Sequence, residues 1–553
     1  MITFFSGDYS ELYVFARRTS TLPGSIRFLA ETGENAEQEE VLNEQLYALF
    51  RFALKKQQTC HLTWEHAEIT QIYLAWCPDQ MERGVTFLSP ATGNEINLKD
   101  WYDTPIREQF HFSPFINWMN DPNGLCWYQG YFHLFYQSNP FGQKWDDIFW
   151  GHAVSKDLVH WIHQPHVLEP QPGLQQDASR KGGAFSGCAW VTDDRMQLYL
   201  TRHDGPLQDG WETAEWQTTA ICRDGLHIED EQILISDKPK GAGFDFRDPA
   251  VDKIDGQMTM VLGSAIDGIP SILLYRQDKE GNWVYQGPLL QERTSGIRTF
   301  ECPDFFKLDG TYVALGACME YTDEANRYNM TRCYIGTYDG KRLLPEQEQW
   351  FDFGSNFYAV QSFLYQGRRL AIGWISDFMN EHREIPDGAY GSMSLPRELH
   401  IKNGRLYMRP ARECDALNGD CLLKTGVGTH AAVDPIPGNA YHATVSLKGD
   451  GDFTIVLARD GEDSLSLVRK DGETSLISTK ANVRNIRFPS GIRNVREIEI
   501  YTDRRLTEVF LNEGEAAGAK LFYQDSRDGC FEGFFADGDL NALQVHAMQT
   551  IWK

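Results

Sequence analysis

Alternation of apolar and polar residues with a period of two is the feature that most constrains this chain. Short segments rich in aromatic and β-branched residues recur, separated by Asp-Gly, Asn-Gly or other glycine-rich turns. Examples are YFHLFYQ (131–137), MQLYLTRH (196–203), QMTMVLGSAI (257–266), TYVALGAC (311–318) and RLAIGWIS (369–376). Strands at this spacing predict an all-β architecture, either a sandwich or a propeller.

Changes in composition predict three parts within the 553 residues. We expect an N-terminal accessory domain at 1–104, a catalytic domain at 105–408 and a C-terminal β-sandwich at 415–553. The tail has single alternating strands such as FTIVLARD and REIEIYTD, which suit a sandwich. One helix is predicted at 34–56, where an acidic start runs into an apolar and then basic stretch. YALFRFALKK within that stretch could form a strand instead.

The charge balance excludes several classes of partner. Lys and Arg number 52 against 78 Asp and Glu, a net charge of −26, which argues against nucleic acid or an anionic membrane surface. The N-terminus lacks a basic region before an apolar run, and no segment approaches the ~20 apolar residues of a membrane helix. The 11 cysteines include no C-x-x-C pair, which fits reduced thiols. We therefore expect a cytoplasmic protein.

Cleavage of an acetal needs an acid to protonate the leaving oxygen and a second carboxylate to attack or to activate water. Three acidic residues lie in rigid, aromatic segments rather than in charged surface runs. The first is Asp121 in NWMNDPNG (117–124), where Trp118 and Met119 offer an apolar wall. Taken alone, this segment is typical of a β-turn with a turn aspartate.

The other two acids have equally distinctive neighbours. Asp248 lies in DFRDPAV (245–251), where Arg247 would keep it ionised and Pro249 would hold its backbone extended. A structural ion pair is the alternative. Glu301 lies in TFECPDFF (299–306), where apolar neighbours would favour the protonated form that a general acid needs. The alternative is a glutamate at a strand end that faces water.

Taken together, W-M-N-D-P-N-G, R-D-P and E-C-P-D resemble the three acidic signatures of glycoside hydrolase family 32, the invertases, fructan hydrolases and related fructosyltransferases. Other matches follow in the family's order: FYQSNP (135–140), WGHAVSKDLVHW (150–161), FSG (185–187), FGSNFYAVQSF (353–363), GWISD (373–377), SMSLPREL (392–399) and YTDRRLTEVFLNEGE (501–515). The resemblance runs from residue 108 to 553 and leaves the first hundred or so residues unexplained. It favours family 32 over family 43, a five-bladed relative that inverts.

The resemblance implies a five-bladed β-propeller followed by a β-sandwich, and it implies roles for individual residues. Asp121 would be the nucleophile that attacks the anomeric carbon of a β-fructofuranoside, and Glu301 the general acid and then the base. Asp248 would hold the fructosyl hydroxyls and stabilise the oxocarbenium-like charge. The three would rise from the inner strands of blades one, three and four. The family's sugar-contact positions are occupied here by Asn120, Gln137, Trp145, Ser186 and Arg247.

Two departures bear on the sites beyond the fructose. The family commonly has Gly after the tryptophan at position 145, whereas this chain has Asp146 and Asp147. These two residues would add charge near the mouth of the funnel along the propeller axis. Cys188 replaces the common Ser after F-S-G, giving a less polar wall. These positions leave the preferred leaving group open between sucrose, sucrose 6-phosphate, inulin and levan.

The residues and the resemblance together predict a retaining β-fructofuranosidase that acts on sucrose or short β-fructosides. We expect no metal and no organic cofactor, since the histidines at 160, 163 and 166 are not a clean ligand set. Three alternatives remain open: a fructosyltransferase, a sucrose-6-phosphate hydrolase with a cationic phosphate site, and a catalytically inactive sugar-binding protein. The apolar segments of 1–104 need a surface to bury against, which suggests a homo-oligomer or a cover for the propeller.

Overall fold

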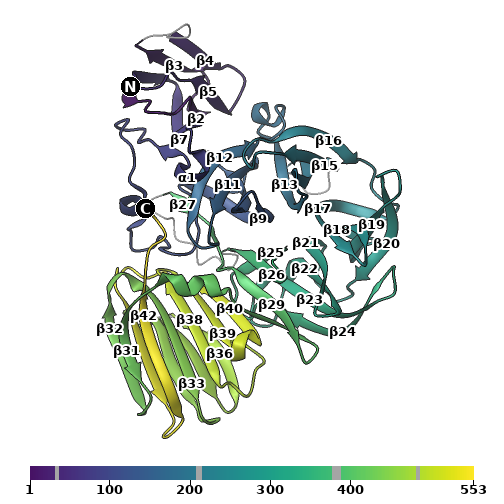
Figure 1. The fold of residues 1–553 in the computed structure, drawn as a ribbon, viewed down its shortest axis with the longest axis vertical. Coiled ribbons are helices and arrows are strands. Elements are labelled where there is room, and N and C mark those ends of the chain that lie inside the picture. The colour runs from purple at the N-terminus through teal and green to yellow at the C-terminus, as the bar shows by residue number, and fades with distance from the viewer. Residues whose placement is uncertain (32–36, 207–213, 377–387, 481–485) are drawn as a thin grey trace.

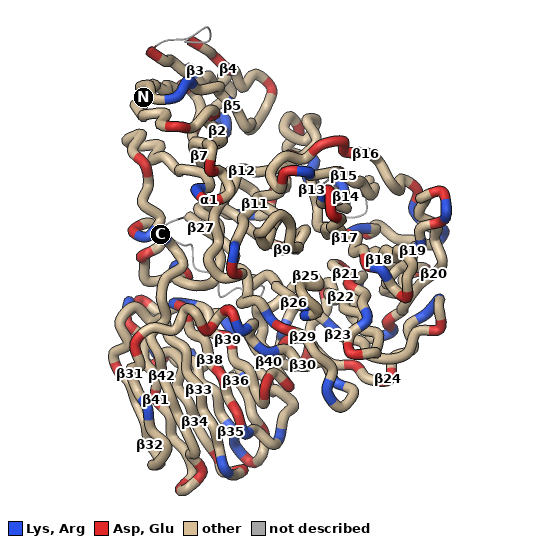
Figure 2. The backbone as a smooth tube through the Cα atoms, in the orientation of Figure 1, with Lys and Arg blue, Asp and Glu red and all other residues tan. Residues whose placement is uncertain are grey.

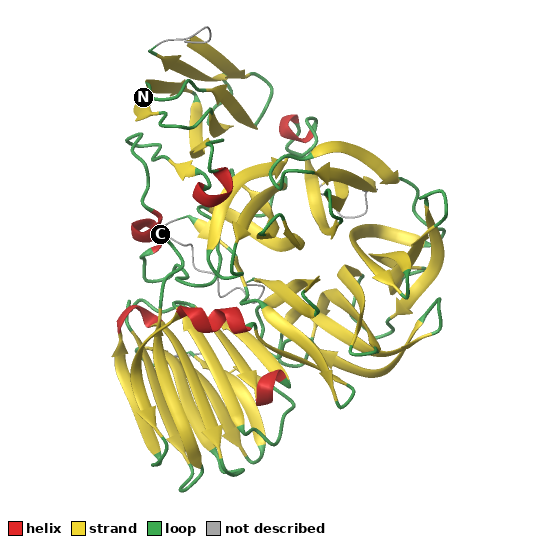
Figure 3. Ribbon diagram, in the orientation of Figure 1, coloured by secondary structure: helices red, strands yellow, loops and turns green. Residues whose placement is uncertain are grey.

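The computed structural model describes residues 1–31, 37–206, 214–376, 388–480 and 486–553. These residues form a small two-sheet unit at the N-terminus, a ring of five sheets and a two-sheet sandwich (Figure 1). Figure 3 shows a few short helical segments and many strands joined by loops. The all-β prediction, a five-bladed propeller followed by a sandwich, is therefore confirmed.

Each blade of the propeller is an antiparallel sheet built mainly from consecutive strands. The first blade contains β9 (Asn117–Tyr128), β10 (Tyr131–Asn139), β11 (Phe149–Ser155) and β12 (Trp161–Leu168). The second contains β13 (Arg180–Val191), β14 (Met196–Pro206), β15 (Ala214–Cys222) and β16 (Glu229–Ile235), and the third β17 (Ala242–Ile254), β18 (Gln257–Ile266), β19 (Ile269–Gln277) and β20 (Trp283–Gln291). The fourth contains β21 (Phe300–Leu308), β22 (Thr311–Thr322), β23 (Tyr328–Tyr338) and β24 (Leu343–Trp350), and the fifth β25 (Phe357–Tyr365), β26 (Arg368–Ile375), β28 (Ser392–Met393), β29 (Arg397–Lys402) and β30 (Arg405–Pro410).

The first strands of the blades line the axis of the ring. β9, β13, β17, β21 and β25 each contact the next, and β25 contacts β9, so the inner strands close a circle. The short strand β27 (Ala389–Tyr390) then pairs in parallel with β9 and joins the end of the ring to its start. Closure in this way removes the free edge that an open sheet would present.

The N-terminal unit consists of two four-stranded sheets, β1-β6-β3-β4 and β5-β2-β7-β8. Its strands are β1 (Ile2–Phe5), β2 (Glu11–Arg18), β3 (Gly24–Ala30), β4 (Glu37–Leu42), β5 (Tyr47–Ala53), β6 (Thr59–Glu65), β7 (Ala67–Ala75) and β8 (Thr86–Phe87), followed by α1 (Gln80–Arg83) within the β7–β8 connection and α2 (Leu98–Tyr102). The predicted helix at 34–56 is wrong over its described part, 37–56, where β4 and β5 stand instead. Residues 34–36 lie outside the described residues.

Strand β5 forms because both of its faces are covered. Phe52 is buried in the core of the N-terminal unit, whereas Tyr47 belongs to a second cluster shared with the first blade. That cluster joins Phe15 and Tyr47 to Phe141 and Phe149 of the propeller. A period of two sends successive side chains to opposite faces, as two apolar surroundings require. The apolar segments of 1–104 therefore bury against the propeller itself.

The sandwich packs two six-stranded sheets, β31-β42-β33-β38-β39-β40 and β32-β41-β34-β35-β36-β37. Its strands are β31 (Asn418–Thr425), β32 (His430–Ile436), β33 (Ala440–Leu447), β34 (Phe453–Asp460), β35 (Asp463–Lys470), β36 (Glu473–Thr479), β37 (Ile486–Pro489), β38 (Glu497–Asp503), β39 (Leu506–Leu511), β40 (Ala516–Leu521), β41 (Gly529–Phe535) and β42 (Leu540–Met548). Single helical turns are η1 (Leu174–Gln176), η2 (Arg412–Leu417), η3 (Pro437–Asn439) and η4 (Asn512–Gly514).

A buried charge network fixes the propeller against the sandwich. Glu508 of the sandwich accepts hydrogen bonds from Arg397 of the fifth blade, at 2.6 Å, and contacts His111 at 3.1 Å. Asp503 contacts the other ring nitrogen of His111 at 2.9 Å. Burial would lower the pKa of His111, but the two carboxylates outweigh it and raise that pKa to about 9. The two parts are therefore coupled as one body.

Lys and Arg positions are interspersed with Asp and Glu along all three parts of the chain (Figure 2). Within the described residues, no helix is both long enough and apolar enough to cross a membrane.

Candidate active site

Every inner strand of the propeller is irregular where it carries a candidate residue or a neighbour of one. Register shifts fall at 119–122 in β9, 184–187 in β13, 247–250 in β17, 301–304 in β21 and 358–361 in β25. An extra residue at such a bulge turns a side chain out of the pleat. Asp121, Asp248 and Glu301 lie in the first strands of the first, third and fourth blades, as predicted.

Asp121 ends a chain of oriented hydrogen bonds within the first two blades. Asn120 donates to Gln137 at 2.6 Å, Gln137 donates to Ser186 at 2.5 Å, and Ser186 donates to Asp121 Oδ2 at 2.6 Å. The indole of Trp118 donates to Asn120 Oδ1 at 2.7 Å, which fixes the orientation of that amide. Four of the predicted residues thus form one unit. The β-turn alternative is wrong, because Asp121 lies inside strand β9.

Asp248 sits in strained backbone. Its φ of 62° lies in the left-handed region, so the extended backbone predicted from Pro249 is wrong at this bulge. The conformation brings its backbone N–H to within 2.9 Å of the Thr201 hydroxyl. Its carboxylate accepts from the backbone N–H of Cys302 at 2.8 Å, and the Cys302 thiol lies 3.4 Å from Asp121 Oδ2 and 3.6 Å from Asp248 Oδ2. Cys302 therefore bridges two of the three acids.

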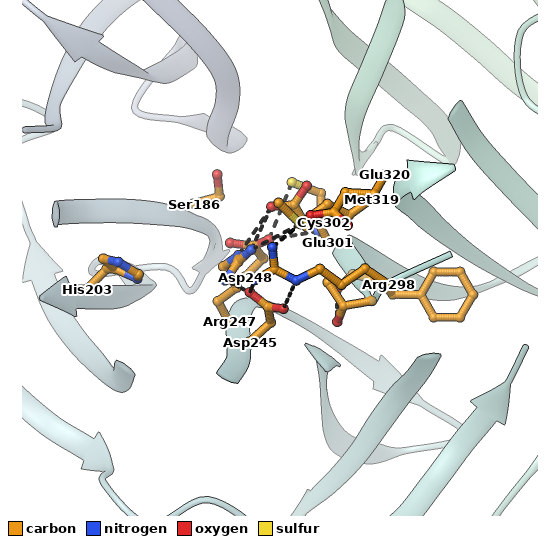
Figure 4. Close-up of polar contacts among 12 residues, drawn as sticks. Ser186, His203, Asp245, Arg247, Asp248, Arg298, Glu301, Cys302, Met319 and Glu320 are labelled. Atoms are coloured by element: carbon orange, nitrogen blue, oxygen red, sulfur yellow. Dashed lines mark hydrogen bonds and ion pairs between the residues drawn. The ribbon is translucent and has the colours of Figure 1, made fainter. Parts of the chain in front are cut away.

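Arg247 pairs with other carboxylates than the one predicted. Its guanidinium donates to Glu301 at 2.9 Å, to Glu215 at 2.8 Å and to Asp245 at 2.6 Å. No hydrogen bond joins it to Asp248 among the described contacts, although its charge acts on that carboxyl. Figure 4 shows Arg247, Asp248, Glu301 and Cys302 gathered in one group, beside Asp245 and Arg298. Arg247 thus compensates a cluster of acids.

The surroundings of Glu301 are polar, not apolar as predicted. One carboxylate oxygen faces Arg247, and the other accepts a hydrogen bond from the Tyr358 hydroxyl at 2.7 Å. Of its two apolar neighbours in sequence, Phe300 is buried in the core between blades, whereas Cys302 contacts the other two acids. Tyr358 comes from FGSNFYAVQSF, a segment that had no assigned role.

Burial dominates the electrostatics of the two aspartates. It raises the pKa of Asp121 to about 6, a shift that the Ser186 hydrogen bond opposes and the nearby charge of Glu301 adds to. Burial also raises the pKa of Asp248 to about 8, with Arg247 opposing and Glu301 adding. Because these carboxyl groups interact, their protons come off in steps that belong to the cluster. At neutral pH the cluster therefore retains a proton.

Trp145 lies apart from the hydrogen-bonded unit, in an outer segment of residues 141–147 that we call the rim. It is 40% exposed, and its ring meets the edge of Phe185 at a centroid distance of 6.1 Å. Phe185 precedes Ser186 and stacks on His203 at 4.2 Å. His203 in turn contacts Glu215 at 2.8 Å. Aromatic contacts thus connect the exposed indole to the acid cluster.

The residues that depart from the family pattern, Asp146, Asp147 and Cys188, do not have the surroundings that were predicted for them. Asp147 is buried and accepts from Tyr47 and from the Gly182 backbone N–H, so only Asp146 is partly exposed, paired with Lys181. Cys188 lines a cavity of about 250 Å³ farther along the inner strands, and none of the eight candidate residues lines that cavity. Its sulfur accepts from the Val251 backbone N–H at 3.2 Å. It is not a wall of the acid cluster.

Besides Tyr358, three neighbours of the acids were not predicted from the sequence: Glu215, Asp245 and Cys302. Glu215 lies in AEWQTT, which carries no recognisable signal, and only folding brings it to Arg247. Asp245 and Cys302 stand inside the quoted acidic segments, so their proximity could have been suspected from those segments alone. No cluster of three or more His, Cys, Asp or Glu side chains that could hold a metal ion occurs in the described part of the chain.

A five-bladed ring with three acids on its inner strands, followed by a sandwich, defines a glycoside hydrolase. Residues 111–410 match the description "Glycosyl hydrolases family 32 N-terminal domain". The chain is 30% identical over 465 residues to a sucrose-6-phosphate hydrolase of Zymomonas mobilis, covering 77% of this chain and 87% of that protein. The chain belongs to glycosyl hydrolase family 32.

Solved structures agree with this membership. A glycoside hydrolase of family 32 from Bifidobacterium adolescentis superposes with a TM-score of 0.93 at 34% identity and covers 100% of both chains, including the N-terminal unit. A family 32 β-fructofuranosidase from Bombyx mori, a variant in complex with sucrose, gives a TM-score of 0.69 at 25% identity over 81% of this chain and 95% of that chain.

Proposed function

We propose that this glycoside hydrolase is a retaining β-fructofuranosidase that cleaves the terminal β-D-fructofuranoside of sucrose or short fructooligosaccharides. The observation that carries the proposal is the asymmetry between two neighbouring acids. Asp121 is oriented by a hydroxyl at the end of the Asn120–Gln137–Ser186 chain, which suits an attacking carboxylate. Glu301 is held by Tyr358 and Arg247, which suits a group that gives and regains a proton.

In the proposed first step, an oxygen of Asp121 attacks the anomeric carbon while Glu301 protonates the departing glycosidic oxygen. The bond to the leaving group breaks and a fructosyl ester of Asp121 forms. In the second step Glu301 takes a proton from water, whose oxygen attacks the same carbon and releases Asp121. Asp248 and Arg247 stay fixed, binding fructosyl hydroxyls and balancing charge as it develops. Neither step uses a metal or an organic cofactor.

The cations around Trp145 decide whether a phosphorylated leaving group is a second candidate. A phosphate on the leaving glucose would need an unpaired cation near Trp145. Lys181 and Arg180 are paired with Asp146 and Asp204, but Lys144, the residue before Trp145, is exposed and forms no ion pair within the described part of the chain. This exposed lysine and the similarity to the sucrose-6-phosphate hydrolase from Zymomonas mobilis make hydrolysis of sucrose 6-phosphate the second candidate.

The test compares kcat/KM for sucrose, sucrose 6-phosphate, 1-kestose, inulin and levan, with product analysis over time at low and high substrate concentration. We expect sucrose to exceed sucrose 6-phosphate, with fructose as the main product. A tenfold preference for sucrose 6-phosphate would replace the proposed substrate. Predominant growth of longer fructosides would replace hydrolysis by transfer. Tight binding without turnover of any fructoside would identify an inactive sugar-binding protein.

A further inference from the structure

A side chain of the N-terminal unit reaches the segment that carries Trp145. The hydroxyl of Tyr47, at the start of β5, donates to Asp147 Oδ2 across 100 residues of sequence. Asp147 Oδ1 accepts from the backbone N–H of Gly182, at the start of β13, at 2.9 Å. One buried carboxylate therefore joins the N-terminal unit to two propeller blades.

The same segment is held at its other end too. Tyr47 packs its ring against Phe141 at a centroid distance of 4.5 Å, and Arg17 donates to the Phe141 carbonyl at 3.3 Å. Both contacts come from the sheet β5-β2-β7-β8 of the N-terminal unit. Residues 141–147 are thus fixed at both ends by the N-terminal unit, with Trp145 between them.

The contact is chemically specific. Among the described residues, no Lys or Arg forms an ion pair with Asp147. Its carboxylate accepts hydrogen bonds from the Tyr47 hydroxyl and from the Gly182 N–H. Burial raises the pKa of Tyr47 well above its ordinary value, which keeps the hydroxyl protonated as a donor. Without that donor, Asp147 Oδ2 would be buried and unsatisfied, and the segment would move to bring it to water. Trp145, 40% exposed, would move with it.

We propose that Tyr47 is a positioning residue through which the N-terminal unit sets the place of Trp145 and so selects the leaving group. The inference rests on the proposed function, in which the leaving group lies beyond the fructosyl unit at this rim. The fructosyl unit itself meets the Asn120–Gln137–Ser186 chain, which makes no contact with Tyr47. The effect of Tyr47 should therefore depend on what is attached to the fructose.

The experiment measures kcat and KM of full-length Tyr47→Phe on two substrates with the same fructosyl group. Sucrose has a leaving group large enough to meet Trp145, and methyl β-D-fructofuranoside does not. We expect the ratio of kcat/KM, sucrose over methyl fructoside, to fall about tenfold, mainly through KM for sucrose. Asp147→Asn, which keeps an acceptor for Gly182 but loses the charged partner of Tyr47, should lower the ratio in the same direction. It also decides the case if Tyr47→Phe fails to fold.

Tyr73→Phe is the matched control. Tyr73 also lies in the N-terminal unit and its hydroxyl contacts His166 of β12 at 3.2 Å, on the outer strand of the first blade. It loses an equivalent contact away from the rim, so its ratio should stay within twofold of wild type. In a Trp145→Ala background, Tyr47→Phe should change the ratio no further, because its effect acts through Trp145.

Three results would overturn the inference. An unchanged ratio in both Tyr47→Phe and Asp147→Asn would show that the contact does not position the rim. An equal loss in Tyr73→Phe would show general loosening of the N-terminal unit. A full additional loss in the Trp145→Ala background would show a route that avoids Trp145. If the wild type hydrolyses neither substrate, the proposed function fails first, which separates the two failures.

Discussion

Replacing Arg247 by Gln should destabilise the protein strongly and in a pH-dependent way. Arg247 is only 6% exposed, and its guanidinium lies within hydrogen-bond distance of Glu215, Asp245 and Glu301. Burial alone would raise the pKa of Glu215, but Arg247 and His203 lower it to about 2, against an ordinary value of 4.5. At 1.36 kcal/mol per pH unit that difference is worth about 3 kcal/mol at neutral pH.

The sign of the pH dependence follows from these pKa directions. In the wild type, the stability from Glu215 is fully present above pH 4.5 and is lost as the pH falls toward about 2. Without Arg247, we expect burial to outweigh the remaining contacts of Glu215 with His203 and the Phe246 N–H and to hold its pKa above the ordinary value, so that stability falls as the pH rises through 4.5. Breaking a buried pair costs roughly 3–5 kcal/mol. For 553 residues the unfolding entropy is about 1.2 kcal/mol/K, so we expect the thermal midpoint to drop by roughly 3–4 °C at pH 7 and by clearly less at pH 5.

Thermal denaturation followed by circular dichroism at both pH values measures this effect. Arg298→Gln is the control, because Arg298 also pairs with Asp245, at 3.2 Å, but its side chain is 41% exposed. An exposed pair is worth about 0–1 kcal/mol. The reasoning is refuted if Arg247→Gln loses no more than Arg298→Gln at pH 7, or if its loss is as large at pH 5.

Two further predictions concern catalysis. Asp121→Asn keeps the volume but removes the attacking charge, so kcat should fall by several orders of magnitude while circular dichroism stays native; more than a tenth of wild-type kcat, only ~1.4 kcal/mol of barrier, would exclude Asp121 as nucleophile. The kcat/KM profile should rise with pH through about 6, where Asp121 ionises, and fall above about 8, where the cluster loses its remaining proton; a flat profile between pH 4 and 6 would contradict the first limb.

Local sequence signals were sufficient for the fold class and for the strands that carry the acids. Glycine turns and a period of two act between near neighbours, and they indicated sheets before any contact was known. The order of the motifs then placed Asp121, Asp248 and Glu301 on the first strands of three blades, where the structure has them. The sugar-contact candidates Asn120, Gln137 and Ser186 also join into one chain.

The wrong predictions share a physical cause, which is tertiary context overriding a local rule. Pro249 disfavours helical backbone at Asp248, but the ring imposes a bulge with φ of 62°. The acidic-to-basic gradient at 34–56 favours a helix, but two apolar surfaces cover the opposite faces of Tyr47–Ala53. The surroundings of Glu301 depend on Arg247 and Tyr358, which lie 54 and 57 residues away in the chain.

The configuration of the first-formed product tests the central proposal most directly. If Asp121 attacks and Glu301 protonates, their carboxyl groups should be separated by the roughly 5–5.5 Å typical of retaining enzymes, and two inversions at the anomeric carbon restore its configuration. With sucrose in the presence of methanol, NMR of the earliest product should show methyl β-D-fructofuranoside, whose methyl group prevents mutarotation. Methyl α-D-fructofuranoside as the first product would contradict the covalent mechanism and the role of Asp121.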